Sequence, residues 1–544
     1  MRTLLLATAA VLGLCSHGSA RAAELLPANR PLEAVIDHYV DALLKQDEIV
    51  AAAQADDAAL IRRLTLDLIG RIPTTAETTD YVRSTDPQKR AKLIDHAIAS
   101  PGFVRHQAAQ FDAMLNNTVA GGDTRKGTVR DYLVAALKDG KSWDKIFREL
   151  MLPDETDPKQ KGASEYLRGR LTDADKLTND VSVAFFGVNV SCAQCHDHPL
   201  VADWKQDHFF GMKSFLVRTY DAGGFLAERE AGLVKFKPAK GAERTAKLMF
   251  LTGTEVKTDT QRELNKDEQK KEKEFADKSK TNKTAPPAPA FSARAKLVDL
   301  ALKPGESEFF ARSIVNRLWH RFLGAGLVNP LDQMHSENPP ALPELLSWLA
   351  RDVDANGYDL KRLTRGIVMS KTYSRSSKTT SQALPASKYF ALAKLKPLTP
   401  MQLATSLKIA TADPTAFDNL KPDDFEKRME SLENAARGFA GSIAQPTDDF
   451  QIGVGEALLF SNSDRAIKEF LIDGGGTLLG KVKALKDNGE IADLLVKTAF
   501  GRAAKADERT AIVDYLQKRN DRPAEAQKQV LWALLTSAEF RFNY

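Results

Sequence analysis

Cysteine is scarce in this sequence of 544 residues, and its scarcity excludes a fold that several disulfides hold together. The chain contains three cysteines. Cys15 lies in an N-terminal segment that we expect to be removed, so the mature protein would keep only Cys192 and Cys195. No thiol is then left for structural disulfides elsewhere. The sulfur chemistry of the chain is therefore concentrated at one place.

Long apolar runs and familiar catalytic motifs are also missing. After the N-terminal segment no apolar run approaches the length that spans a bilayer, so we expect no integral membrane span. The sequence has neither the G-x-S-x-G elbow of hydrolases nor the H-E-x-x-H pair of zinc proteases. Gly475 to Lys481 imitates a phosphate-binding loop, but Val482 stands where that loop needs a Ser or Thr for magnesium. The motifs therefore indicate no common enzyme class.

The excess of one charge sign is small for a chain of this length. The formal net charge is +5, and loss of Arg2 and Arg21 with the N-terminal segment leaves about +3. A protein this close to neutrality gives no reason to propose nucleic acid as a partner. The length predicts two or three domains, because one hydrophobic core does not grow to this size.

Residues 1–22 have the features of a secretory signal peptide. Arg2 supplies the positive end, residues 4–14 form a short apolar core, and Ala20-Arg21-Ala22 is a small-residue cleavage site. Lipid attachment at Cys15 is an alternative, which the bulky Leu14 disfavours because a small residue is expected there. We therefore expect export to the periplasm or cell envelope.

The most informative motif is Cys192-Ala-Gln-Cys195-His196, which has the C-x-x-C-H pattern of covalent haem attachment. Two thiols at this spacing can add across the two vinyl groups of one porphyrin, and the adjacent imidazole then lies beneath the iron. Haem c is the cofactor that this pattern predicts. Cys192 and Cys195 would be the thioether anchors and His196 the proximal ligand. The function that follows is electron transfer or a haem-dependent redox step; whether the chain is an enzyme stays open.

Two other chemistries fit the same residues. In an exported protein, Cys192 and Cys195 could close a small disulfide, and the chain would then be an envelope scaffold or binding protein. The cysteines could instead hold zinc or iron without haem, with His198 and His208 completing a tetrahedral site. His196, His198 and His208 are therefore the candidate metal ligands.

Hydrophobic periodicity predicts a mostly α, multi-helical fold in two domains. Apolar residues follow helix spacing on both sides of a charged segment, while short Gly-punctuated clusters after residue 216 favour a small β insertion after the C-x-x-C-H segment. Residues 255–283 are almost wholly charged or polar, and a Pro-rich stretch follows. The predicted division is an N-terminal helical domain with the motif, a charged and Pro-rich linker, and a C-terminal helical domain, at residues 23–254, 255–292 and 293–544.

A faint internal repeat links the two ends of the chain. The phrase LTLDLIGRIPTTAE at residues 64–77 is echoed by LVKTAFGRAAKADE at residues 495–508. A helix, a Gly-Arg turn and an acidic helix start explain both copies. The first copy carries the charged cluster Arg62, Arg63, Asp67 and Arg71, for which we expect ion pairing within the chain.

Five phrases resemble a known family, namely secreted, cytochrome-c-like proteins typical of planctomycetes that pair the domains of unknown function numbered 1549 and 1553. These phrases occupy residues 62–77, 185–204, 311–334, 338–350 and 534–544. The family's CAQCHDHP phrase falls on residues 192–199. The resemblance implies haem through this motif and no established reaction. It also implies a possible partner, because relatives are often encoded beside exported proteins that resemble sulfatases; the redox partner is unknown.

A second axial ligand for a haem iron is not evident from the sequence. His208 and Met212 lie about one helix length from the motif, but both depart from the family's pattern. His320, Met334 and His335 would have to reach across from the second domain. His320 and His335 are also candidates for a site of that domain, whereas His38, His96 and His106 are expected to be surface or core residues.

Overall fold

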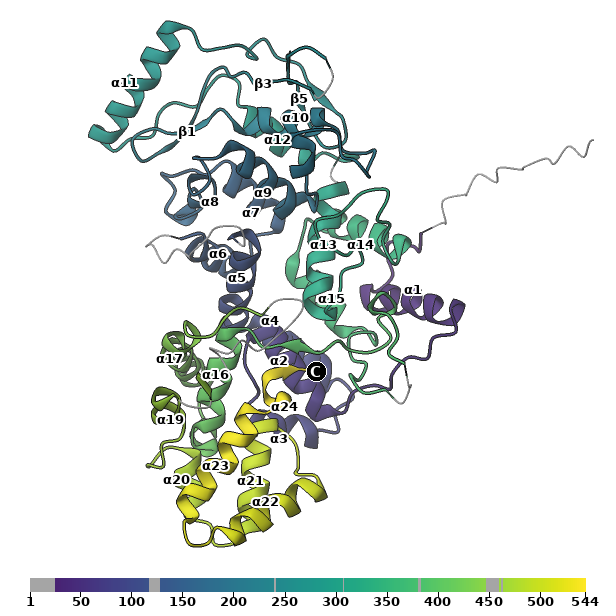
Figure 1. Cartoon of the computed structure of the whole chain (residues 1–544), viewed down its shortest axis with the longest axis vertical. Helices are drawn as coiled ribbons and strands as arrows, with labels where there is room; N and C mark the ends of the chain where they lie inside the picture. Colours follow the sequence, from purple (N-terminus) through teal and green to yellow (C-terminus); the bar gives the residue numbers. More distant parts are fainter. Residues whose placement is uncertain are drawn as a thin grey trace, which may run out of the picture.

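The computed structural model describes residues 25–116, 128–238, 241–306, 308–379, 383–446, 459–460 and 463–544. The predicted signal peptide at residues 1–22, with Cys15, lies outside the described residues. Helices dominate the described part of the chain, which confirms the mostly α fold class (Figure 1). None of the described helices is both long and apolar enough to cross a membrane.

Ten α-helices and two short 3-10 helices precede the charged segment in the described part of the chain. They are α1 (Leu32–Gln46), α2 (Asp57–Ile69), α3 (Thr75–Arg83), α4 (Lys89–Ala99), α5 (Pro101–Asn116), α6 (Val129–Lys138), α7 (Trp143–Met151), α8 (Glu165–Arg168), α9 (Ala174–Phe186) and α10 (Gln206–Leu216), with short 3-10 helices η1 (Pro158–Gln160) and η2 (Ser191–Gln194). Side-chain caps mark several starts: the Asp56 carboxylate accepts the Ala59 N–H, and Thr74 and Glu77 form a capping box.

The later helices begin within the charged segment. They are α11 (Lys266–Asn282), α12 (Ala293–Ala301), α13 (Glu308–Leu323), α14 (Pro343–Ala355), α15 (Leu360–Met369), α16 (Pro400–Thr411), α17 (Pro422–Ala440), α19 (Asp464–Phe470), α20 (Leu478–Lys483), α21 (Asn488–Phe500), α22 (Ala506–Lys518), α23 (Pro523–Thr536) and α24 (Ala538–Arg541), with η3 (Ser387–Tyr389) and η4 (Pro414–Phe417). Pro343 opens α14, as its sequence position predicts. The apolar spacing of residues 530–540 predicts one helix. The helix instead breaks at Ser537, whose hydroxyl caps α24 by accepting the Phe540 N–H.

The described strands are short and form two-stranded antiparallel sheets. The small β insertion is confirmed after the motif as three pairs, and a fourth pair joins distant parts of the chain. They are β1 (Thr219–Asp221) with β2 (Leu226–Glu228), β3 (Lys235–Phe236) with β4 (Arg244–Thr245), β5 (Leu248–Met249) with β6 (Glu255–Val256), and β7 (Lys396–Pro397) with β8 (Phe542–Asn543).

The charged segment at residues 255–292 contains a packed helix. Most of α11 is exposed, but the Glu272 carboxylate pairs with Arg229 at 2.8 Å, and a Cβ on Gly223 would lie 2.4 Å from the Ala276 carbonyl oxygen. The loop between β1 and β2 therefore lies directly against α11, at the upper edge of the molecule in Figure 1. One large hydrophobic core includes residues from both sides of this segment. The predicted domain boundaries stay a prediction.

Helix α2 lies between two hydrophobic cores. Leu64 and Leu68 belong to the large core that extends from α1 to residue 391, whereas Leu66 belongs to a second core built mainly from α16 to α24. An amphipathic helix buries one face, but α2 is covered on both. Its polar side chains are consequently buried and need partners inside the protein.

The internal repeat is confirmed as repeated geometry. Gly70 ends α2 and Gly501 ends α21, both in the left-handed conformation at φ 76° and 69°. The next residue in each copy is an arginine, Arg71 or Arg502, which makes two hydrogen bonds of 2.7 to 2.8 Å to the carboxylate six residues later. The same turn therefore recurs at both ends of the chain.

Candidate functional site

The C-x-x-C-H segment lies in the loop that follows α9. Gly187 ends this helix at φ 68°, and the chain then makes the 3-10 turn η2, which carries the first cysteine. Cys192, Cys195 and His196 are all exposed, while Ala193 between them is buried and anchors the turn. The motif therefore lies at the surface, on a turn that the buried side chain of Ala193 holds in place.

Residues 332–336 hold this loop from one side. The Met334 N–H donates to the Gly187 carbonyl at 3.1 Å, and the Asn189 N–H donates to the Asp332 carbonyl at 2.8 Å. A Cβ on Gly187 would lie 3.0 Å from the Met334 Sδ, so the two segments touch at a point where glycine leaves room. Farther along, the Asp203 carboxylate accepts the Ser336 N–H at 2.7 Å. Two phrases far apart in sequence thus form one unit.

The imidazole of His196 has the hydrogen bond that a metal-binding histidine needs. Cys192 and Cys195 are free thiols. The His196 Nδ1 lies 2.7 Å from the Asp197 carbonyl oxygen. A carbonyl oxygen accepts only, so Nδ1 carries the proton and the neutral ring keeps its Nε2 lone pair. A backbone carbonyl that orients the ring in this way is the usual support of a metal-bound histidine.

The other two candidate ligands have the opposite arrangement. The His198 Nδ1 accepts the backbone N–H groups of Leu200 and Val201 at 3.3 and 3.1 Å. The His208 Nδ1 accepts the Lys205 N–H at 3.1 Å, and burial lowers the pKa of His208. In a neutral ring Nε2 then carries the proton and offers no lone pair. Among the described residues no three His, Cys, Asp or Glu side chains are arranged to hold a metal ion. These contacts favour His196 as the metal-binding imidazole.

The remaining axial candidates lie on other segments, of which residues 332–336 contact the motif loop. Met212 is fully buried in the large core on α10. Met334 packs at Gly187 and is 6% exposed. The His335 Nε2 lies 3.2 Å from the Gln333 Oε1, and His320 lines a cavity on α13 that is described below. Among the axial candidates, His196 alone belongs to the C-x-x-C-H segment itself.

The expected ion pairing of the charged cluster holds for Asp67 and Arg71, whereas Arg62 and Arg63 bind backbone carbonyls. The buried Asp67 carboxylate accepts from Lys396 Nζ at 2.7 Å, Asn543 Nδ2 at 2.8 Å and the Tyr373 hydroxyl at 2.9 Å. Burial and this carboxylate raise the pKa of Tyr373. The Arg62 guanidinium donates to the Phe540 carbonyl at 2.8 Å. The α2 face between the two cores is therefore tied to β7 and β8.

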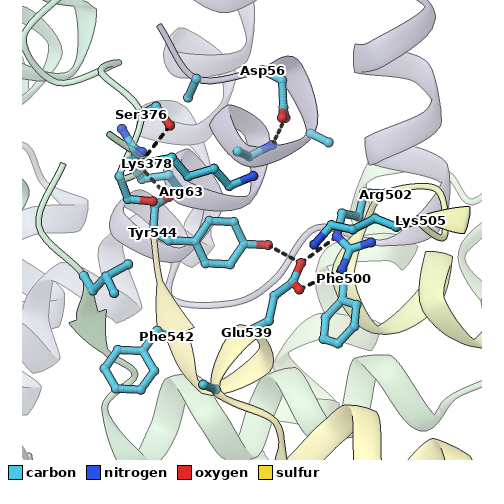
Figure 2. Close-up of a pocket in the computed structure, with 16 residues that line it drawn as sticks. Asp56, Arg63, Ser376, Lys378, Phe500, Arg502, Lys505, Glu539, Phe542 and Tyr544 are labelled. Atoms are coloured by element: carbon cyan, nitrogen blue, oxygen red, sulfur yellow. Dashed lines mark hydrogen bonds and ion pairs between the residues drawn. The ribbon is translucent and has the colours of Figure 1, made fainter. Parts of the chain in front are cut away.

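A surface pocket of about 470 Å³ lies beside this cluster. Figure 2 shows Tyr544 directed toward Glu539, with Arg502 on the other side of that carboxylate. Arg502 makes hydrogen bonds to both Glu539 and Glu508, which raise its pKa. Its charge is matched by two carboxylates, so the arginine braces the C-terminal segment and is not left to bind a ligand.

A second hollow, which we call the α13 cavity, was missed in the sequence. Its volume is about 390 Å³, and its polar lining includes Asp67, His106, Arg317, His320, Arg321 and Lys396. Of these, the sequence singled out Asp67 for internal pairing and His320 as a site candidate. The signal for the arginines was present: Arg317, His320 and Arg321 stand at i, i+3 and i+4 on one helix and share a face.

Comparison with known families assigns two regions of the chain. Residues 35–221 match the model of PSCyt2, a protein of unknown function (DUF1549), and residues 293–437 match that of PSD1, a protein of unknown function (DUF1553). The C-x-x-C-H segment lies in the first region and α13 in the second. Neither curated proteins nor solved structures gave a match.

Proposed function

We propose that this chain, which belongs to the family that pairs the PSCyt2 and PSD1 domains, is an exported protein that holds one haem through Cys192, Cys195 and His196. The observation that carries the proposal is the 2.7 Å hydrogen bond between His196 Nδ1 and the Asp197 carbonyl. It leaves Nε2 as a nitrogen ligand directly beside two free thiols.

The exposure of the motif supports a role in electron exchange. A haem bound here would supply one-electron redox chemistry. Cys192 and Cys195 would fix its edge by thioether bonds, and the Asp197 carbonyl would hold the His196 ring in one orientation. The loop is also tied to residues 332–336 by backbone hydrogen bonds. Such a tie keeps the ligand position constant, which electron transfer favours because little then has to reorganise.

The rival chemistries have less support from the same contacts. A zinc or iron site would need His198 or His208, and each already uses Nδ1 to accept a backbone N–H. A disulfide between Cys192 and Cys195 would leave His196 only the tuning of thiol acidity. Its exposed ring and its carbonyl contact would then be incidental. We therefore place haem first, and a non-haem metal or disulfide-stabilised envelope protein second.

Export is part of the proposal, because thioether attachment of haem takes place outside the cytoplasm. Cleavage after Ala22 would give a mature chain that begins at Ala23, which intact mass measures directly. The expected partners are a redox protein and, from the family resemblance, an exported sulfatase-like protein. Co-purification from the native envelope tests both.

The decisive experiment is expression with an export signal in cells whose cytochrome maturation is active. The purified protein should show a Soret band, a pyridine haemochrome of thioether-linked haem, and an intact mass raised by one haem. His196→Ala should abolish the native spectrum, and the matched His198→Ala should keep it. A colourless wild-type protein without added mass would refute the proposal. Zinc bound in the wild type and lost in His198→Ala would establish the metal alternative in its place.

A further inference from the structure

The α13 cavity is lined by two arginines that no carboxylate contacts in the described part of the chain. Arg317 and Arg321 lie one turn apart on α13 and both line the cavity. Two like charges at this spacing repel each other along a helix. Neither guanidinium forms a salt bridge with any carboxylate in the described part of the chain. A pair of cations kept together against repulsion points to something that binds them.

Each arginine is held by weaker partners than a carboxylate. Arg321 donates to the Gln107 amide oxygen at 2.7 Å and lies 4.6 Å over the Phe111 ring. Arg317 donates to the Val183 carbonyl at the end of α9, and its buried Nε has no hydrogen-bond partner. These contacts orient the two groups and leave their charge unneutralised. The two guanidinium groups can therefore still donate hydrogen bonds to a ligand in the cavity.

The carboxylate that lines the cavity is already engaged. Asp67 accepts from Lys396, Asn543 and Tyr373, so its charge is balanced by Lys396 before either arginine is considered. Burial lowers the pKa of Arg317 and of Arg321 to about 10 in each case. Burial, with the charges of Arg321 and Lys396, lowers the pKa of His106 to about 3. Burial is the main cause of each shift, and neighbouring positive charges add to it for Arg321 and His106.

In the pocket of Figure 2, by comparison, Arg502 is neutralised by Glu508 and Glu539. In the α13 cavity no equivalent carboxylate contacts Arg317 or Arg321 among the described residues. The cavity volume of about 390 Å³ lies in the range of small-molecule sites.

We propose that the α13 cavity binds a small molecule through an oxyanion group, a carboxylate, sulfate or phosphate, which Arg317 and Arg321 grip. The planar guanidinium fork matches all three groups, since each presents two oxygens side by side. Gln107 and Phe111 keep Arg321 in position for this contact. The site is separate from the C-x-x-C-H motif, so it stands whether or not haem is bound.

Arginine-selective modification tests the site in the wild-type protein, with no risk from misfolding. Phenylglyoxal labelling followed by peptide mass analysis would be run at constant ionic strength with sodium sulfate, phosphate or acetate at about 10 mM. At least one oxyanion should slow labelling of Arg317 and Arg321 by about threefold or more. Arg312, an exposed-side neighbour on α13 that pairs with Glu308, is the internal control and should be unaffected.

The three probes separate the possible ligand types, and matched variants locate the contact. The protecting oxyanion should raise the thermal midpoint of the wild type and of Arg312→Gln, and this rise should be lost in Arg317→Gln and Arg321→Gln. The proposal is overturned if no probe protects either arginine. Equal slowing at Arg312 would also overturn it, because that pattern reports general screening.

Discussion

Replacement of Asp67 should lower the free energy of unfolding and so measure how much its buried ion pair stabilises the protein. Its carboxylate is 6% exposed and accepts three hydrogen bonds, from Lys396, Asn543 and Tyr373. Removing one member of a buried ion pair costs about 3 to 5 kcal/mol, because the other charge stays buried without a partner. We expect Asp67→Asn near the lower value, about 3 kcal/mol, since the amide can keep the Tyr373 contact.

A double-mutant cycle isolates the pair from the rest of the cluster. Lys396→Met keeps the apolar stem and removes the charge. The double variant Asp67→Asn with Lys396→Met should then be less destabilised than the sum of the single variants, by about 1.5 to 3 kcal/mol. The assay is urea unfolding followed by far-ultraviolet circular dichroism and tryptophan fluorescence, since two cores can unfold in separate steps.

The matched control is the ion pair between Asp57, which is also on α2, and Lys89 of α4. Its charged atoms lie 2.6 Å apart, but Asp57 is 40% exposed. The corresponding cycle should give a coupling energy below about 1 kcal/mol. A coupling energy below about 0.5 kcal/mol for Asp67 and Lys396 would refute the reasoning that burial between the cores makes this pair strong.

Three further predictions follow from buried or strained positions. The pKa of His106 is about 3 in the folded protein against 6.5 for the free side chain. Between these two pH values the unfolded chain binds a proton on His106 and the folded protein does not. The free energy of unfolding should fall as pH drops below 6.5, by up to about 1.4 kcal/mol per pH unit. Between pH 7 and 5, His106→Gln should lose about 2 kcal/mol less of this free energy than the wild type. Equal losses of the two proteins in urea unfolding would contradict this. Gly187→Ala should cost about 1 kcal/mol more than Gly140→Ala in thermal unfolding, since both have φ 68° but only Gly187 faces Met334; equal losses would mean the contact with Met334 is unimportant. Arg170→Lys should cost more than about 2 kcal/mol, because lysine cannot bind Asp180 and the carbonyls of Tyr166 and Leu115 together, and an unchanged melting temperature would oppose that account.

The fold class and the repeated turn could be predicted because local signals determine them. Helix periodicity, the opening Pro343 and the Gly-Arg turns at Gly70 and Gly501 all depend on residues close in sequence. The break at Ser537 was missed because apolar spacing continues across it, while a hydroxyl that caps the next turn interrupts the helix.

The site could be predicted only in part, for the same reason. The spacing of Cys192, Cys195 and His196 is a local pattern. The hydrogen bonds that distinguish His196 from His198 depend on how the loop turns, which the residue types do not reveal. The α13 cavity forms only where α5, α13 and β7 meet. Helix α13 follows α5 by about 200 residues, and β7 follows α5 by about 300. His106 therefore looked like an ordinary core histidine.

The pairing of β7 with β8 has a consequence for how the newly made protein matures. Helix α2 leaves the ribosome long before residues 540–543, yet Arg62 and Asp67 find their partners there, at the Phe540 carbonyl and the Asn543 amide. Until those residues emerge, this helix cannot bury its charged side chains without loss, so it stays hydrated. If the chain is exported as we propose, such a delay would keep this helix open during transport, and the C-terminal residues would complete the structure afterwards.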